Sequence, residues 1–218
     1  MRMRSVLFAI LALLGTSLAS HAGVIYTVNL DTTALVGSFG LAFQFADGTG
    51  TGDGNNVAVI SDFQFGGGSP LSTQYLWGAT GSLSDTVTLA DSDPLGTYFA
   101  QQFTPGGTLS FLLALTTNVD DGGVFDVFTF ALTDSAFFNI PTTSGASGDY
   151  PDVMLSITLD SDTPTPRTYG TDYPERTLIA LNAPVWDNAV PEPATWLPVG
   201  SILGIACCLR RRWRAHRG

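Results

Sequence analysis

Short apolar runs alternate with turns rich in Gly, Asp, Thr and Pro along most of the chain. Residues 24–30 carry β-branched and aromatic side chains, and residues 82–89 alternate apolar with polar positions, as half-buried strands do. No stretch between residues 23 and 189 places apolar side chains at helical spacing. Strands are therefore expected at residues 24–30, 41–45, 57–65, 73–77, 82–89, 97–103, 108–117, 124–132, 136–140, 153–159 and 177–181.

Many short strands with Gly, Pro and Asp at the turns predict an all-β fold. The expected architecture is an antiparallel β-sandwich, jelly-roll-like in its topology. Residues 124–132 are largely apolar on both faces, which predicts a central strand. A β-solenoid is the alternative, and the lack of a fixed-period repeat counts against it.

The first 22 residues have the organisation of a secretory signal peptide. Two arginines precede an apolar core at residues 6–14, and Ser20 and Ala22 occupy the small-residue positions before a cleavage site. The arginines are not adjacent, which favours the Sec translocon over the twin-arginine route, with signal peptidase cutting after Ala22. An uncleaved anchor is the alternative, although the apolar core is short for one.

The last 29 residues, 190–218, contain three consecutive parts. They are the motif Val190-Pro191-Glu192-Pro193, the apolar run 194–209, and a basic tail containing Arg210, Arg211, Arg212 and Arg214. The run is at or just under the length of about 17 residues that a membrane-spanning helix needs. The arginines would then act as a stop-transfer signal on the cytoplasmic side. Residues 23–189 are left between the two ends as one domain, called here the exported domain.

In its order and position, this tail resembles the PEP-CTERM sorting signal of Gram-negative bacteria. That resemblance implies recognition by the membrane protease exosortase and removal of the tail near Pro191-Glu192-Pro193. It also implies a transient inner-membrane anchor, followed by delivery to the cell surface or extracellular matrix. Proteins of this class are linked to exopolysaccharide and biofilm production, so an exopolysaccharide is an expected partner. An ordinary C-terminal anchor is the alternative reading of the same residues.

The exported domain is strongly acidic. The whole chain has 19 acidic residues and nine basic ones, all of them arginines, and its net charge is −10. Only Arg167 and Arg176 lie within the exported domain. Nucleic acids and anionic lipids bind through Lys and Arg contacts to phosphate, so neither is expected as a partner. Cations are attracted instead.

Several classes of enzyme are excluded by residues that the exported domain lacks. His21 and His216 lie in the two end segments, Cys207 and Cys208 lie in the apolar run, and the chain has no lysine. Ser-His-Asp and Cys-His nucleophiles, Schiff-base lysines and ordinary zinc sites are therefore ruled out. A glycosidase with paired carboxylates remains formally open. The expectation is a non-catalytic protein without a cofactor.

One acidic loop is nevertheless a candidate for calcium. Asp47, Asp53 and Asn55 offer hard oxygen ligands on a Gly-rich backbone, and residues 91–93, 120–121 and 160–162 hold similar acidic pairs. None of these segments matches an EF-hand loop or a nonapeptide repeat. The competing interpretation is a set of solvated turns, where Asp is common because it bonds to its own backbone.

A second candidate loop spans residues 165–176. It contains Tyr169, Tyr173 and Arg167, and aromatic rings with a few polar groups could stack on sugar rings. This gives an alternative function, a carbohydrate-binding module that depends on calcium. The tyrosines could equally pack on the sandwich while the arginines pair with nearby Asp side chains.

Overall fold

The computed structural model describes residues 23–120, 122–148 and 151–188. The strands in these ranges are β1 Gly23–Asp31, β2 Phe39–Ala46, β3 Val57–Gln64, β4 Ser69–Trp77, β5 Thr80–Gly81, β6 Thr86–Ala90, β7 Thr97–Thr104, β8 Thr108–Thr116, β9 Val127–Thr133, β10 Leu155–Thr158, β11 Arg167–Thr168 and β12 Val185–Asn188. One short helix, α2 Thr143–Ser147, lies between β9 and β10. The predicted signal peptide and sorting tail lie outside the described residues. Within those residues, no helix is long and apolar enough to span a membrane.

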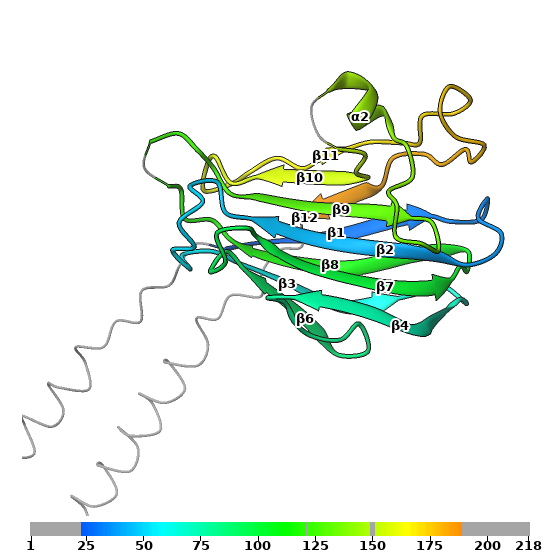
Figure 1. Ribbon diagram of the computed structural model, residues 1–218, viewed down its shortest axis with the longest axis horizontal. Helices are drawn as coiled ribbons and strands as arrows, with labels where there is room; N and C mark the ends of the chain where they lie inside the picture. Colours follow the sequence, from blue (N-terminus) through cyan, green and yellow to red (C-terminus); the bar gives the residue numbers. More distant parts are fainter. Residues whose placement is uncertain (1–22, 121, 149–150, 189–218) are drawn as a thin grey trace, which may run out of the picture. The chain divides into compact units, whose positions relative to one another are not determined.

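The strands form two six-stranded antiparallel sheets that pack face to face (Figure 1). The first sheet has the order β12-β1-β8-β3-β6-β5, and the second has the order β11-β10-β9-β2-β7-β4. Because neighbours in each sheet are far apart in sequence, most pairings are non-local. The predicted all-β class with two packed antiparallel sheets is confirmed.

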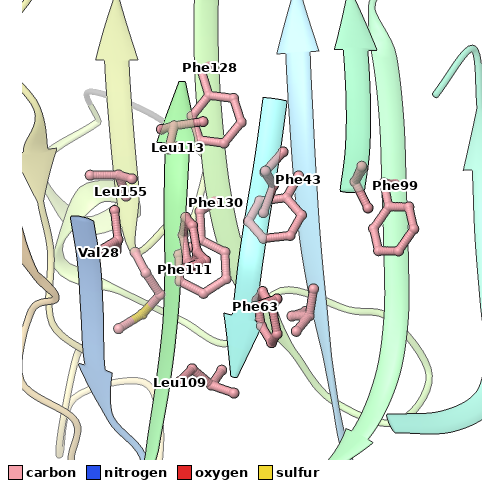
Figure 2. Close-up of a cluster of buried hydrophobic side chains, with 14 of the residues drawn as sticks. Val28, Phe43, Phe63, Phe99, Leu109, Phe111, Leu113, Phe128, Phe130 and Leu155 are labelled. Carbon is pink, nitrogen blue, oxygen red and sulfur yellow. The ribbon is translucent and has the colours of Figure 1, made fainter. Parts of the chain in front are cut away.

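The core lies between the sheets and is dominated by phenylalanine. Phe43 of β2 sits at its centre, where its ring lies 5.3 Å from both Phe111 and Phe130 and 6.1 Å from Phe128 (Figure 2). Alternate residues of each strand point inward. Phe128, Phe130 and Leu132 are each two residues apart along β9, so all three side chains lie in the core. Each such side chain contributes about 1.5–3 kcal/mol through removal of its surface from water.

The predicted central strand is confirmed but begins later than expected. β9 lies between β10 and β2, and it starts at Val127 instead of residue 124. Its outward-facing Ala131 and Thr133 are buried as well, which explains why both faces read as apolar. Residues 124–126, including Asp126, belong to the preceding loop.

The strand predicted at residues 136–140 is wrong. The Asp134 carboxylate accepts hydrogen bonds from the backbone N–H groups of Ala136 and Phe138, at 2.8 and 3.0 Å. Phe137 adopts a positive φ of 65°, outside the range of regular β-strands. An apolar run is therefore bent into a turn by one acidic side chain that precedes it.

The strand predicted at residues 177–181 is also wrong. Thr171 holds this segment as a loop, because its hydroxyl donates to the carbonyl of Ile179 and accepts from the backbone N–H of Leu181. The backbone N–H of Thr171 donates to the Leu181 carbonyl at 3.0 Å. The strands that do form in this part of the chain, β11 and β12, are short and were not predicted.

Candidate metal centre in the loops at one end of the sandwich

Strand register brings three loops together at one end of the sandwich. Ala46 at the end of β2 pairs with Val127 at the start of β9. Val57 at the start of β3 pairs with Ala90 at the end of β6, and Ala58 pairs with Leu115 near the end of β8. The loops 47–56, 91–96 and 117–126 therefore leave the sheets side by side, and each connects one sheet to the other.

The first of these loops is organised by Asp47. Its carboxylate accepts hydrogen bonds from the backbone N–H groups of Thr49 at 2.7 Å, Gly50 at 3.1 Å and Gly52. Burial raises the pKa of this carboxyl group, but these bonds outweigh it, and the pKa of Asp47 lies below its usual value. The backbone N–H of the next residue, Gly48, donates to Asp126 Oδ1 at 2.9 Å and joins this loop to the third.

Asn56, fully buried, ties the three loops to one another. Its backbone N–H donates to Asp91 Oδ2 at 2.9 Å, and its side-chain Nδ2 donates to Asp126 Oδ2 at 2.8 Å. Its Oδ1 accepts from the backbone N–H of Asn118 at 2.9 Å. A single residue thus positions two carboxylates that are 35 residues apart in sequence, one through its backbone N–H and one through its side chain. This residue was not among the predicted site residues.

Four carboxylates gather around this point, and we call Asp47, Asp91, Asp120 and Asp126 the acidic cluster. Oxygens of Asp47, Asp120 and Asp126 all lie within 4.8 Å of one another. The carboxyl group of Asp91 lies within hydrogen-bonding reach of Asp126 and is 0% exposed. The loops 91–96 and 117–126 thus both carry acidic side chains to the end of the sandwich where loop 47–56 lies.

Simultaneous ionisation of all the carboxyl groups in the acidic cluster is unfavourable. Burial and the neighbouring Asp126 raise the pKa of Asp91 to about 7, and the charge of Asp53 acts in the same direction. Burial also raises the pKa of Asp120, against the opposing effect of a hydrogen bond from Asn55. The neighbouring charges that act on Asp91 and Asp120 are all negative.

Three oxygen atoms in and beside the cluster are buried without a hydrogen-bond donor among the described residues. They are Asp91 Oδ1, Asp120 Oδ2 and the side-chain Oδ1 of Asn55. The other unpartnered side-chain atoms in the described ranges are hydroxyls of Thr97, Ser156 and Tyr169, which carry a proton of their own. The buried carboxylate and amide oxygens without a donor in the described ranges are therefore concentrated at one place.

The predicted calcium residues are only partly brought into this centre. Asp47 is a member of the cluster, and Asn55 donates a hydrogen bond to Asp120 Oδ1. Asp53 is exposed and accepts from the backbone N–H of Asn55 at 3.2 Å, so it lies at the edge. Asp126 was missed because it falls within an apolar run that predicted a strand.

The second predicted site is not assembled as expected. Arg167 lies on β11 and lines a hollow of about 420 Å³ together with Thr158, Asp160, Ser161 and Thr165. Neither Tyr169 nor Tyr173 is among the described residues that line it. Tyr169 is half-buried and Tyr173 is exposed, just before a cis peptide bond to Pro174.

The predicted pairing of arginine with aspartate is found at Arg176. Its guanidinium group bonds to Asp152 at 2.9 Å and to Asp172. These contacts hold the loop after β11 against the segment that carries α2, because Arg176 also donates to the carbonyl of Thr142. Arg176 therefore has a structural role in this loop.

A group of exposed aromatic side chains lies on the edge strand β4. Tyr75 and Trp77 are 56% and 58% exposed and, two residues apart, face the same side of the sheet. Trp77 pairs with Tyr98 of β7, and its Nε1 donates to Asp93 Oδ2 at 3.1 Å. This surface is not among the sites predicted from the sequence.

Comparison with known proteins found no match to this chain. No family model matches the chain, and neither a curated protein nor a solved structure shows significant similarity to it. The functional argument therefore rests on the residues and the geometry described above.

Proposed function

We propose that this chain is a non-catalytic surface or extracellular-matrix protein that is exported and then sorted by the PEP-CTERM and exosortase route. The proposal rests on the sequence signals at both ends and on one structural observation. Most of the domain's carboxylates take part in local structure and are not free for catalysis. Exopolysaccharide or biofilm is the setting that the resemblance implies. The protein would be held transiently in the inner membrane before its release to the surface.

Most of the acidic side chains that could serve catalysis are committed to local structure. Asp31, Asp93 and Asp134 each accept a hydrogen bond from the backbone N–H two residues later, as turn-capping aspartates do. In the acidic cluster, Asp91 and Asp126 are almost completely buried. A glycosidase needs two carboxyl groups about 5–9.5 Å apart on either side of an accessible bond, so this cluster does not suit hydrolysis.

The strand order supports a jelly-roll topology for the sandwich. One sheet contains the run β1-β8-β3-β6 and the facing sheet contains the run β2-β7-β4. Consecutive strands thus alternate between the sheets over β1 to β4 and again over β6 to β8, as in a chain folded as one long rolled hairpin. Strands β9 to β12 extend the edges next to β2 and β1. This fold hosts many functions, so it supports an export module without naming its ligand.

The sorting step can be tested with two changes in the tail. Glu192→Ala should leave membrane insertion intact, since Glu192 lies outside the apolar run, yet should block processing by exosortase. Replacing Arg210, Arg211 and Arg212 by Ser should let the short helix pass through the membrane, because the cost of about 2.5–3.5 kcal/mol for each buried charge is removed. Blots of membrane and medium fractions from hosts with and without exosortase would separate these results.

Glu175→Ala is the matched control, because Glu175 is the exported domain's own glutamate and is exposed. It should be processed and located like the wild type. N-terminal sequencing of the exported protein should begin at Gly23. If both tail variants are processed like the wild type, the tail is a simple anchor and the sorting proposal fails.

A second candidate function, carbohydrate binding, is favoured by the exposed rings of Tyr75 and Trp77. Aromatic rings on a flat sheet edge can stack on the apolar faces of sugar rings, and Trp77 is held in place by Asp93. The hollow beside Arg167 lies at the opposite edge of this sheet, so it does not belong to the same surface. Glycan-array binding that is lost in Trp77→Ala, and kept in Phe138→Ala, would support this function over a purely structural one.

A further inference from the structure

We propose that the acidic cluster is a calcium-binding site, in which carboxylate oxygens of Asp47, Asp120 and Asp126 surround one ion. The amide oxygen of Asn55 supplies a further oxygen ligand, and the buried carboxylate of Asp91 lies beside these ligands without being one of the three. This inference stands independently of the export route and of any glycan ligand.

The spacing of the oxygens suits a single ion. Calcium binds oxygen at about 2.3–2.6 Å, so two ligands of one ion lie at most about 5 Å apart. The oxygens of Asp47, Asp120 and Asp126 meet this limit in every pair, at 4.8 Å or less. They come from the first and third loops, which the register places side by side.

The second observation is the buried carboxylate of Asp91. This side chain is 0% exposed, and its Oδ1 has no hydrogen-bond donor among the described residues. Asn56 holds it beside the carboxyl group of Asp126, since Asn56 donates a hydrogen bond to each of them, and two ionised carboxylates cannot bond to each other. A buried acceptor that faces another acceptor is costly unless a cation or a shared proton lies between them.

Two more unpartnered oxygens lie in and beside the cluster. Asp120 Oδ2 and Asn55 Oδ1 are also buried without a donor in the described part of the chain. Each carboxylate oxygen of Asp126 accepts one hydrogen bond, one from Gly48 and the other from Asn56. Each oxygen keeps a second lone pair for an ion. The loops thus hold the side chains in position and leave lone pairs for an ion.

The chemistry of the ligands selects calcium among the common cations. Every available donor is an oxygen, and the exported domain has no His or Cys, which zinc would require. Calcium accepts six to eight oxygens in irregular geometry, whereas Mg²⁺ demands a near-ideal octahedron and retains its waters. Three carboxylates and an adjacent amide on irregular Gly-containing loops match the larger ion.

Such an ion would hold the two sheets together at this end. The loops 47–56, 91–96 and 117–126 each pass from one sheet to the other. Residues 23–188 contain no cysteine, so no disulfide fixes these crossings. Calcium would fix them instead, so folding stability would depend on the calcium concentration.

The test is calorimetry on the full-length chain with CaCl₂, with MgCl₂ and with chelator. At a calcium concentration about 100-fold above Kd, the melting temperature should rise by about 5–10 °C. In titration calorimetry, Asp120→Asn and Asp91→Asn should each weaken calcium binding by at least about 10-fold. The matched control is Asp85→Asn, an exposed aspartate at the opposite end of β6 from Asp91, and it should bind like the wild type.

Asp91→Asn also separates the proposal from a shared proton. Its amide can donate to Asp126, so the metal-free variant should fold and melt above the metal-free wild type, because a repulsion is removed. With calcium, the order should reverse or the difference should close. A wild type whose melting temperature does not respond to calcium, or responds equally to Mg²⁺, would overturn the proposal. So would a calcium response in Asp91→Asn and Asp120→Asn equal to that of Asp85→Asn.

Discussion

The hydroxyl group of Tyr26 on β1 donates a hydrogen bond to the backbone carbonyl of Pro164, 138 residues further along the chain. Tyr26 is 1% exposed, and the ring of Trp186 from β12 packs against it edge-on at 5.7 Å. Pro164 belongs to the connection between β10 and β11. One side chain of the first sheet therefore fixes a loop of the second.

This bond predicts a loss of stability at alkaline pH. Burial raises the pKa of Tyr26 to about 12, whereas a tyrosine in the unfolded chain ionises near 10. The folded state then holds the proton more tightly, so the free energy of unfolding should fall as pH rises from about 10 to about 12. Urea unfolding at a series of pH values measures this decline.

Tyr26→Phe should reduce that decline, because it removes the ionisation. At neutral pH the variant should lose about 1–3 kcal/mol, since the Pro164 carbonyl is left without its donor. Tyr173→Phe is the control, as Tyr173 is exposed and should keep the wild-type profile. A Tyr26→Phe profile that falls as steeply as the wild type would show that another group controls the alkaline transition.

The central position of Phe43 predicts a large effect of truncation. Its ring contacts rings from both sheets, including Phe63, Phe99 and Phe111 (Figure 2). Phe43→Ala should lower the free energy of unfolding by about 3–5 kcal/mol, because it removes buried surface and leaves a cavity. Phe138→Ala, at a 73% exposed site, should change it by less than about 0.5 kcal/mol. Equal losses in urea denaturation would contradict the assignment of the core.

The close backbone packing at Gly48 is expected to support the acidic cluster. A Cβ atom at this position would overlap the backbone carbonyl of Phe125, next to Asp126. Gly48→Ala should therefore push loop 47–56 away from loop 117–126. We expect a loss of about 1–3 kcal/mol in stability, measured by thermal unfolding, and weaker calcium binding.

Gly107→Ala is the matched control for this change. Its Cβ would meet its nearest neighbour at 3.9 Å, an ordinary contact distance. It should therefore leave both stability and calcium binding near wild-type values. If Gly48→Ala behaves like Gly107→Ala, the two loops are not as tightly packed as the structure describes.

The class of fold could be predicted from the sequence because a strand is encoded locally. Short apolar runs rich in β-branched and aromatic residues, bounded by turn residues, identified β1, β2, β7 and β8, and a run that is apolar on both faces identified β9 as a central strand. Where one polar side chain overrides that alternation, as Asp134 does before residues 136–140, the pattern predicted a strand that does not form.

The composition of the acidic cluster was decided only by tertiary structure. Asp47, Asp91 and Asp120 were each recognised as acidic turn residues, but the sequence carries no local signal that they meet. Their proximity follows from the register of non-local pairings, such as Ala46 with Val127 and Val57 with Ala90. A shift of one residue would turn those side chains to the other face of the sheet, and register depends on the whole core. The sequence therefore determined the ligand chemistry, and the packing of the two sheets determined where it is concentrated.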